Sequence, residues 1–322
     1  MNLKIDDSAK LIGKMKLGYN SYIAQGTVLR SINDSLTIGN STWILENSVL
    51  IGTLEQPLIV GSKTVFGHKC IAIGSSIGNL CEIGNGVIIL PGSKVGNMCI
   101  FGEGTIVPEG SVIPDGSVVV GRPGRIIRNL NIDDKNMILR MRNNDISLST
   151  FKENLIDSEP KEGEVMGRLY KYGVKYPEVA ESAFLYDSAE ITGDVKIGKN
   201  SVIASGVKII GNSHGPVIIG DNVQILENTV LHLLPDNELI IEDNVIIGPG
   251  CIIHGTIIGP NSIIESGAIV CDYSKLGKNT LVKSGTLIKQ RSIFNDNSIL
   301  EGYPAKNIGE NRELQKKPSW AI

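Results

Sequence analysis

Residues 241–282 read IEDNVIIGPGCIIHGTIIGPNSIIESGAIVCDYSKLGKNTLV, and an aliphatic side chain recurs there at every sixth position. One interval is shorter, the five residues from Ile253 to Ile258. A period of six is neither the helical period of about 3.6 nor the alternation of an ordinary strand. The same series, with its own five-residue step, occurs earlier in the chain at Val60, Phe66, Ala72, Ile77, Ile83, Ile89, Val95 and Phe101. The chain is therefore built from internal repeats.

A six-residue repeat has a simple structural meaning. Each repeat is a short strand followed by a turn, with its aliphatic side chain pointing inward. Three repeats close a triangular coil of about 18 residues, and successive coils stack at the strand spacing of about 4.8 Å. Glycine and asparagine, as in Gly39-Asn40 and Gly220-Asp221-Asn222, suit corners that need a positive φ. The pattern resembles the left-handed parallel β-helix family and predicts an all-β fold.

The composition narrows the class of protein. Apolar residues make up 41% of the 322 residues and the net charge is only −3, which excludes disorder and gives no electrostatic basis for binding nucleic acid. Aromatic residues are only 5%, as a narrow β-helix interior requires. The five cysteines form no CxxC pair and are expected to be reduced and buried. No signal segment or membrane-spanning run is present, so we expect a cytoplasmic protein without a membrane partner.

A second, larger repeat relates the two halves of the chain. Shifting the sequence by 181 residues aligns residues 36–127 with the second half without a gap, and it places Cys70 on Cys251 and Gly121 on Gly302. We therefore predict two left-handed parallel β-helix domains of hexapeptide repeats joined by a short helical linker. The predicted boundaries are 1–130 for the first domain, 131–180 for the linker, 181–310 for the second domain and 311–322 for the tail.

The linker and the tail carry their own patterns. Residues 133–142 read as a helix that stops at Asn143-Asn144, and Thr150 to Glu153 has the form of a capping box that would begin a second helix. Residues 157–175 are charged and are expected to form a surface connection. The polar tail ends near Trp320 and is expected to dock back onto the body.

Two of the four histidines have a suggestive spacing. His232 and His254 directly follow the inward positions Leu231 and Ile253, and they lie 22 residues apart. One coil accounts for about 18 of these residues and a loop at 233–237 for the remainder, so both imidazoles should stand in one column on adjacent coils. Two neutral imidazoles so placed can bind one divalent metal. The alternative is a pair of solvated surface histidines, and His214 is expected to be an ordinary loop residue.

The shift of 181 shows how the halves complement each other. It places His232 on Ile51, His254 on Ile73 and Pro249 on His68, so each half lacks the imidazoles that the other has. The segments Asn228-Thr229-Val230-Leu231-His232 and Ile247-Gly248-Pro249, followed by His254-Gly255, resemble the histidine motifs of the gamma-class carbonic anhydrases. Phe66-Gly67-His68 supplies the middle histidine of that motif.

The resemblance implies a zinc site shared between domains or subunits, with His68, His232 and His254 as ligands and a zinc-bound hydroxide as nucleophile. Fe²⁺ and Co²⁺ suit imidazole as well. It also implies a homo-oligomer, a small-molecule and possibly anionic substrate, and a reciprocal site at Ile51, Ile73 and Pro249 that holds no metal. The expected catalytic residues are Glu227 or Gln224 to orient the hydroxide and Arg30 to hold an anion, with Asp236 and Glu238 as alternative proton shuttles.

The chain also departs from that family. Ile32 stands where the family pairs an aspartate with the residue corresponding to Arg30, and Leu226-Glu227 replaces a Gln-Asp pair. These departures argue against efficient CO₂ hydration and leave another carbonyl-type substrate open. Two other functions are compatible with the repeats. One is a hexapeptide acyltransferase with a histidine base in an inter-helix cleft, and the other is a non-catalytic scaffold.

Overall fold

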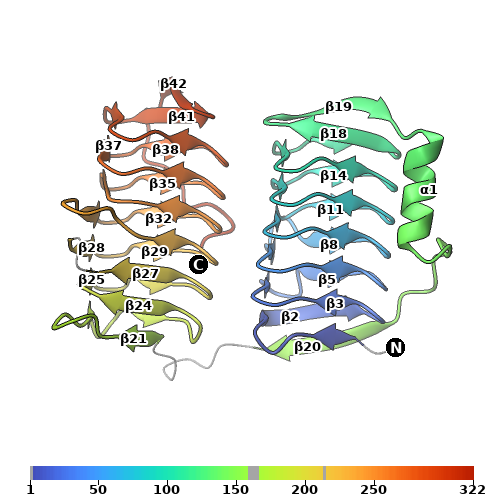
Figure 1. Ribbon diagram of the computed structural model, residues 1–322, viewed down its shortest axis with the longest axis horizontal. Coiled ribbons are helices and arrows are strands. Elements are labelled where there is room, and N and C mark those ends of the chain that lie inside the picture. Colours follow the sequence, from blue (N-terminus) through green and yellow to red (C-terminus); the bar gives the residue numbers. More distant parts are fainter. Residues whose placement is uncertain (1–2, 159–166, 213–214) are drawn as a thin grey trace. The chain divides into compact units, whose positions relative to one another are not determined.

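The computed structural model describes residues 3–158, 167–212 and 215–322. The chain divides into two compact units, Met1–Pro160 and Lys161–Ile322, and each unit is a left-handed parallel β-helix (Figure 1). The predicted all-β fold is confirmed. The finer division at residues 130, 180 and 310 stays a prediction, and strands as early as Arg168–Tyr170 already belong to the second unit's sheets.

The first unit has three faces built from parallel strands. The β9 sheet contains β1 (Lys4–Ile5), β3 (Tyr22–Ile23), β6 (Trp43–Ile44), β9 (Val65–Phe66), β12 (Glu82–Ile83), β15 (Ile100–Phe101), β18 (Ser117–Gly121) and β19 (Gly124–Asn129). This first face ends with β19, which pairs antiparallel with β18. The β10 sheet contains β2 (Lys10–Gly18), β4 (Val28–Ser31), β7 (Val49–Gly52), β10 (Ile71–Ile73), β13 (Ile88–Ile89) and β16 (Ile106–Val107). The third face starts from the second half of β2 and continues through β5 (Leu36–Ile38), β8 (Leu58–Val60), β11 (Ser76–Ile77), β14 (Lys94–Val95) and β17 (Val112–Ile113).

The second unit repeats this plan. The β30 sheet contains β21 (Arg168–Tyr170), β24 (Glu190–Gly193), β27 (Lys208–Gly211), β30 (Val230–Leu231), β33 (Ile252–Ile253), β36 (Ile269–Val270) and β39 (Leu287–Ile288). The β31 sheet contains β22 (Glu178–Val179), β25 (Val195–Ile197), β28 (Val217–Ile219), β31 (Leu239–Ile241), β34 (Thr256–Ile258), β37 (Ser274–Leu276) and β40 (Ile293–Phe294). The β29 sheet contains β23 (Phe184–Leu185), β26 (Val202–Ile203), β29 (Gln224–Ile225), β32 (Ile246–Ile247), β35 (Ile263–Ile264), β38 (Leu281–Val282), β41 (Ser298–Gly302) and β42 (Ala305–Glu310).

The strand register follows the sequence period. Ile83 lies beside Phe101, 18 residues further on, and this is the regular coil. Ile253 lies beside Val270, and this coil is one residue shorter because of the five-residue step. Corners take the expected left-handed backbone, with Asn222 at φ 55°, although after Gly39-Asn40 the left-handed residue is Ser41 at φ 53°. The hexapeptide spacing thus fixes which residues stack on adjacent coils.

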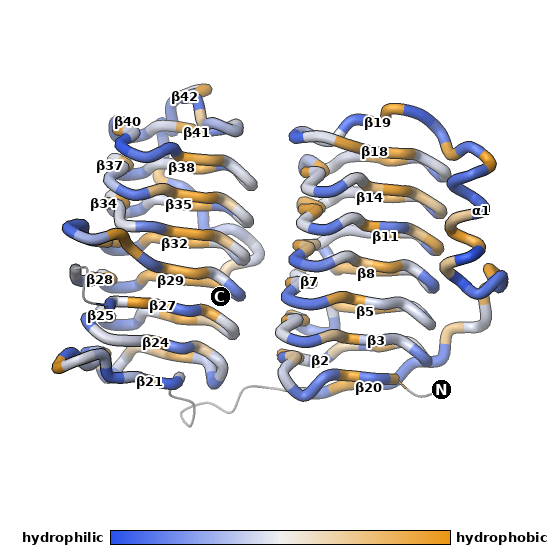
Figure 2. Tube along the Cα trace, viewed as in Figure 1, coloured by the Kyte–Doolittle hydropathy of each residue, from blue (hydrophilic) through white to orange (hydrophobic). Residues whose placement is uncertain are grey.

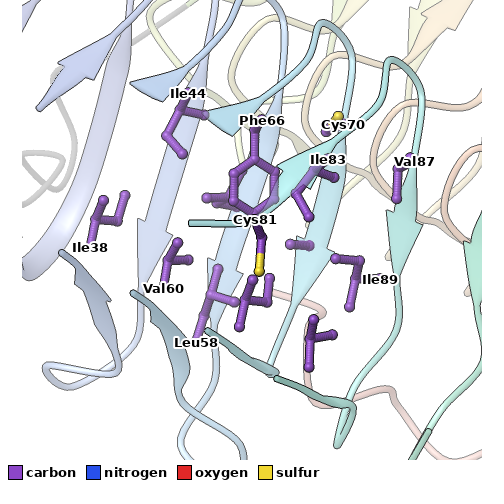
Figure 3. Packing of buried hydrophobic residues seen from close by; sticks show 14 of the residues in the cluster. Ile38, Ile44, Leu58, Val60, Phe66, Cys70, Cys81, Ile83, Val87 and Ile89 are labelled. Atoms are coloured by element: carbon purple, nitrogen blue, oxygen red, sulfur yellow. The ribbon is translucent and has the colours of Figure 1, made fainter. Parts of the chain in front are cut away.

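The interior of the first unit is a stack of inward side chains. Phe66 packs between Ile44 and Ile83 on neighbouring coils, and all three are at most 3% exposed (Figure 3). Figure 2 shows apolar segments recurring from coil to coil within each unit. Burying one such side chain contributes about 1.5–3 kcal/mol. Because each coil admits only a few side chains, the core is built from Ile, Val, Leu, Ala and Cys.

Four of the five cysteines are buried in these interiors. Cys70, Cys81, Cys99 and Cys251 are free thiols with no solvent exposure, and Cys271 is half-buried. Each buried sulfur lies near a carbonyl oxygen of the next coil, as in Cys70 Sγ to Gly84 O at 3.1 Å. Burial raises the pKa of both Cys70 and Cys251 to about 12. The expectation of reduced, core-filling thiols is confirmed for these four.

We predict that Cys271 alone reacts with iodoacetamide in the folded protein at pH 8. The thiolate is the reactive form, and burial keeps it scarce at Cys70 and Cys251. All four buried cysteines, Cys81 and Cys99 included, also have no solvent exposure through which the reagent could reach them. Burial also raises the pKa of Cys271, so its alkylation should be slower than that of a free thiol. Peptide mass spectrometry after timed alkylation measures this, with urea-unfolded protein as the control. Native labelling of Cys251 at the rate of Cys271 would contradict the packing described here.

Helix α1 (Ile132–Met141) lies along the first unit and confirms the helix predicted at 133–142 (Figure 1). Its capping box joins Asn131 and Asp134, and Asn143 and Asn144 follow with positive φ. Ile138 is fully buried. Within the described ranges, no helix has the length and apolar character needed to cross a membrane.

The second helix predicted from Thr150 is wrong. Residues Glu153–Ser158 form β20, which pairs antiparallel with β2 from Gly13 to Gly18. The preceding segment is held by buried Asn40, whose amide donates to Thr150 O at 2.8 Å and accepts from Lys152 N at 3.2 Å. The open edge of β2 offers a ladder of backbone hydrogen bonds, and this tertiary pairing outweighs the local helix-start signal.

The C-terminal tail docks on the second unit, as predicted. Trp320 is only 7% exposed, and Asn279 donates from its side-chain amide to Glu313 O at 3.1 Å. The side chain of Gln224 accepts from Ile322 N at 2.9 Å and donates to Ile322 O. The tail therefore lies against the β29 sheet.

Candidate functional site

His232 and His254 come together in the second unit. Each directly follows its strand, and the parallel pairing of β30 with β33 sets Leu231 beside Ile253. The two half-buried imidazole rings have centroids 5.9 Å apart and planes inclined at 82°. The predicted column of two histidines on adjacent coils is present, and the intervening loop accounts for the extra residues between them.

A buried carboxylate fixes one of these rings. Asp272 Oδ2 lies 2.8 Å from His254 Nδ1, and the Asp272 side chain is only 3% exposed. Burial alone would raise the pKa of the Asp272 carboxyl, but hydrogen bonds from the Leu234 amide and from His254 outweigh it and hold that pKa below its usual value. The ionised carboxylate requires Nδ1 to be the protonated nitrogen, so Nε2 of His254 is the nitrogen available to a cation.

The same carboxylate organises the loop after β30. Asp272 Oδ1 accepts from Leu234 N at 3.0 Å, Gly255 N at 3.1 Å and the Asn237 side-chain amide at 3.2 Å. A side chain at position 255 would displace this arrangement, because its Cβ would lie 2.1 Å from Asn237 Nδ2 and 3.1 Å from Asp272 Oδ1. Loop 233–238 is therefore fastened to the coil that carries His254.

His232 has a different neighbour. The Asn212 side-chain amide nitrogen lies 3.2 Å from His232 Nε2. Asn212 follows β27, one coil before His232. A cation that used this nitrogen of His232 would replace the amide as its partner. The fourth histidine, His214, lies outside the described residues.

The first unit carries the single histidine. His68 follows β9, its side chain is 53% exposed, and its Nδ1 lies 2.6 Å from Glu46 Oε2. As in His254, a carboxylate occupies Nδ1 and leaves Nε2 as the available nitrogen. The positions equivalent to His232 and His254 in this unit, Ile51 and Ile73, are fully buried.

The three expected catalytic residues lie in different surroundings. Arg30 is 4% exposed and lies on β4, beside Ile51 of the next coil. Glu227 is fully buried in the turn between β29 and β30, on the same coil as His232. Gln224 lies on the β29 sheet, and its amide bonds Ile322. The structure thus joins His232 with His254, and it does not place Gln224 with them.

The donor set of this pair suits a transition metal. Tetrahedral zinc with Zn–N bonds of about 2.0–2.1 Å brings imidazole centroids to about 5 Å apart. The observed 5.9 Å needs only a small ring movement. Among the described residues, no three His, Cys, Asp or Glu side chains gather as a metal site. Sequence reasoning missed Asp272 and Asn212. The available signal for Asp272 was its position one coil after His254, where the other half has Pro91.

The two relatives described here each match less than half of this chain. A family described as "Hexapeptide repeat of succinyl-transferase" matches residues 57–91 and 238–271. A carbonic anhydrase of Geobacillus kaustophilus is 42% identical over 142 residues, which cover 44% of this chain and 78% of that protein. The mitochondrial gamma carbonic anhydrase 2 of Arabidopsis thaliana is 31% identical over 138 residues, 41% of this chain and 49% of that protein.

A solved structure shows a similar extent of match. The crystal structure of a putative acetyltransferase from Bacillus cereus is 36% identical and covers 45% of this chain and 83% of that chain, with a TM-score of 0.44. The chain spans about half the length of the Arabidopsis relative and more than three quarters of the Geobacillus relative.

Proposed function

This chain belongs to the gamma carbonic anhydrase-like family of hexapeptide-repeat proteins, and from that premise we propose a metal-dependent hydratase or hydrolase. Its cation would be held by His232 and His254 of the second unit and by His68 of the first, from the same chain or from another copy in a homo-oligomer. The observation that carries the proposal is the convergence of His232 and His254, with Nδ1 of His254 bound by buried Asp272.

Catalytic zinc usually takes three protein ligands, so the pair needs one more imidazole. His68 is the candidate because its Nδ1 is occupied by Glu46 and because its half of the chain lacks the other two histidines. The reciprocal positions Ile51, Ile73 and Pro249 offer no ligand side chain. We propose Zn²⁺ as the resident metal, with Fe²⁺ and Co²⁺ as alternatives that imidazole also accepts.

When bound, such a cation lowers the pKa of water to about 7 and so supplies a nucleophile at neutral pH. The chain's own residues would then orient the substrate and move protons. We assign Glu227 to orientation or proton relay, because it is buried on the coil of His232. Asp236 and Glu238 are exposed on the adjoining loop and suit proton exchange with solvent. Arg30 would hold an anionic group, and Gln224 can act only when Ile322 releases its amide.

The test is metal analysis of the purified chain together with turnover assays. We expect about one metal ion per chain, and hydrolysis of p-nitrophenyl acetate that stops with dipicolinate and returns with Zn²⁺. Compared with an efficient anhydrase, this protein is expected to lose more of its CO₂ hydration than of its ester hydrolysis. The reason is the departure from the family at Ile32 and at the Leu226-Glu227 pair. Metal-free protein that acetylates an acceptor from acetyl-CoA would favour the acyltransferase alternative. Bound metal without turnover would favour a scaffold.

A further inference from the structure

We propose that Asp272 is a positioning residue that fixes His254 for metal binding and holds loop 233–238 beside it. This inference rests on the proposed metal site, but its first step concerns the metal-free protein. The contact that carries it joins Asp272 Oδ2 to His254 Nδ1 at 2.8 Å.

The two carboxylate oxygens of Asp272 accept hydrogen bonds from different partners. Oδ2 receives the ring of His254, whereas Oδ1 receives Leu234 N, Gly255 N and the Asn237 amide. Every one of these partners must donate if His254 carries its proton on Nδ1. Asparagine at position 272 has one oxygen and one NH₂ group. Whichever way its amide is turned, the NH₂ group would face an N–H donor instead of an acceptor. The site therefore needs a carboxylate and not merely a polar side chain of that size.

The ring of His254 needs such a restraint because its side chain is 36% exposed. An unrestrained imidazole samples both tautomers and more than one ring orientation. Outer partners of this kind set the tautomer and orientation of metal-binding histidines, and their loss typically costs about 10- to 100-fold in metal affinity. Fastening loop 233–238 to the same carboxylate also restrains the backbone that carries Asp236 and Glu238.

The duplication gives an independent argument. The residue equivalent to Asp272 in the first half is Pro91, and the residue equivalent to His254 is Ile73. Glu227 differs from Asp272 in this respect. Its equivalent in the first half, Glu46, pairs with His68. The second half keeps Glu227 although it has Pro249 at the position equivalent to His68. Asp272 thus occurs only in the half that carries the histidine it contacts.

The experiment has two readouts, and the first uses wild-type protein without metal. Long-range ¹H–¹⁵N NMR of the imidazoles is expected to show His254 protonated on Nδ1, and Asp272→Asn is expected to shift it toward a mixture of tautomers. The second readout is Co²⁺ titration followed by visible absorption, where Asp272→Asn should weaken binding by about 10- to 100-fold. Asp221→Asn is the matched control, because Asp221 also accepts a backbone N–H, from Lys199, on another face of the coil.

The outcomes separate this inference from the proposed function. A wild-type His254 protonated on Nε2 would overturn the positioning role, even if Asp272→Asn failed to fold. Folded Asp272→Asn that binds Co²⁺ as tightly as wild type would also overturn it. Wild-type protein that shows the Nδ1 tautomer but binds no cation would instead refute the proposed function and leave the restraint by Asp272 established.

Discussion

Replacing His68 with alanine is expected to remove bound metal as completely as replacing His232 with alanine. The proposed site has three imidazoles, and a pair alone lacks the ligand count of a catalytic zinc site. The loss should exceed the roughly 10- to 100-fold cost of changing an outer partner. Because the His68 side chain is 53% exposed, the free energy of unfolding should change by no more than about 0.5 kcal/mol. Metal content is measured by mass spectrometry after equilibrium dialysis.

The control is Lys69→Asn, which changes the next residue of the same exposed turn. Lys69 has φ 56°, a conformation that asparagine tolerates, so this variant should keep its metal. Full metal retention by His68→Ala would contradict a shared site and leave only the pair in the second unit.

Mixing the single variants then tests whether the site is formed within one chain or between chains. If His68 reaches the histidine pair of another copy, unfolding and refolding His68→Ala together with His232→Ala should restore part of the metal. If each chain completes its own site, neither variant can supply the other, and the mixture stays empty. In an equimolar mixture at most half of the wild-type metal can return, because only the His68→Ala chains carry an intact histidine pair.

The architecture could be predicted from the sequence because each part of the fold is determined by a short stretch of neighbouring residues. Each hexapeptide determines one strand and one corner, so the period alone sets which residues stack. The pairing of Leu231 with Ile253 follows from adding the loop to one regular coil. Features that depend on distant parts of the chain were not predictable in this way. β20 pairs with β2 far away in sequence, and nothing near Thr150 signals that partner.

The candidate site shows the same division. The spacing located the histidine pair, because both residues follow inward positions of known register. It did not reveal Asp272, since that contact depends on how two side chains turn toward each other across a coil. Gln224 was chosen from its place before His232, yet the tail that bonds its amide lies almost a hundred residues later. Periodicity fixes backbone neighbours, whereas side-chain partners also depend on rotamers and on segments outside the repeat.

Replacing Arg142 with alanine is expected to destabilise the first unit by about 3–5 kcal/mol. Arg142 Nη2 lies 2.6 Å from Glu82 Oε1, and the two side chains are only 7% and 11% exposed. Its Nε also donates to Lys63 O at 2.8 Å, which fastens the end of α1 to the β-helix. Alanine would leave Glu82 buried without its cation. Arg140→Ala, an exposed change in the last turn of α1, is the control and should stay within about 0.5 kcal/mol of wild type.

The measurement can be confined to the first unit. The chain has two tryptophans, Trp43 on β6 and Trp320 in the tail, so a Trp320→Phe background leaves Trp43 fluorescence as a reporter of the sheet that carries Glu82. Urea unfolding of the full-length protein then gives the stability of that unit. An unchanged midpoint for Arg142→Ala would show that the ion pair contributes nothing net.

The pH dependence distinguishes a buried charge from lost packing. Burial raises the pKa of the Glu82 carboxyl, although Arg142 acts in the opposite direction. Because the folded-state pKa exceeds the unfolded value of about 4.3, the contribution of Glu82 to stability is full below that value and is lost as the pH rises through the folded-state pKa. Without Arg142 that pKa rises further, so the deficit of Arg142→Ala should be largest at neutral pH and smallest near pH 4. Adding Glu82→Leu to Arg142→Met should restore most of the stability at pH 7, since removing both charges avoids the uncompensated one. A deficit that stays constant from pH 4 to pH 7 would assign the loss to packing of the α1 terminus rather than to the charge of Glu82.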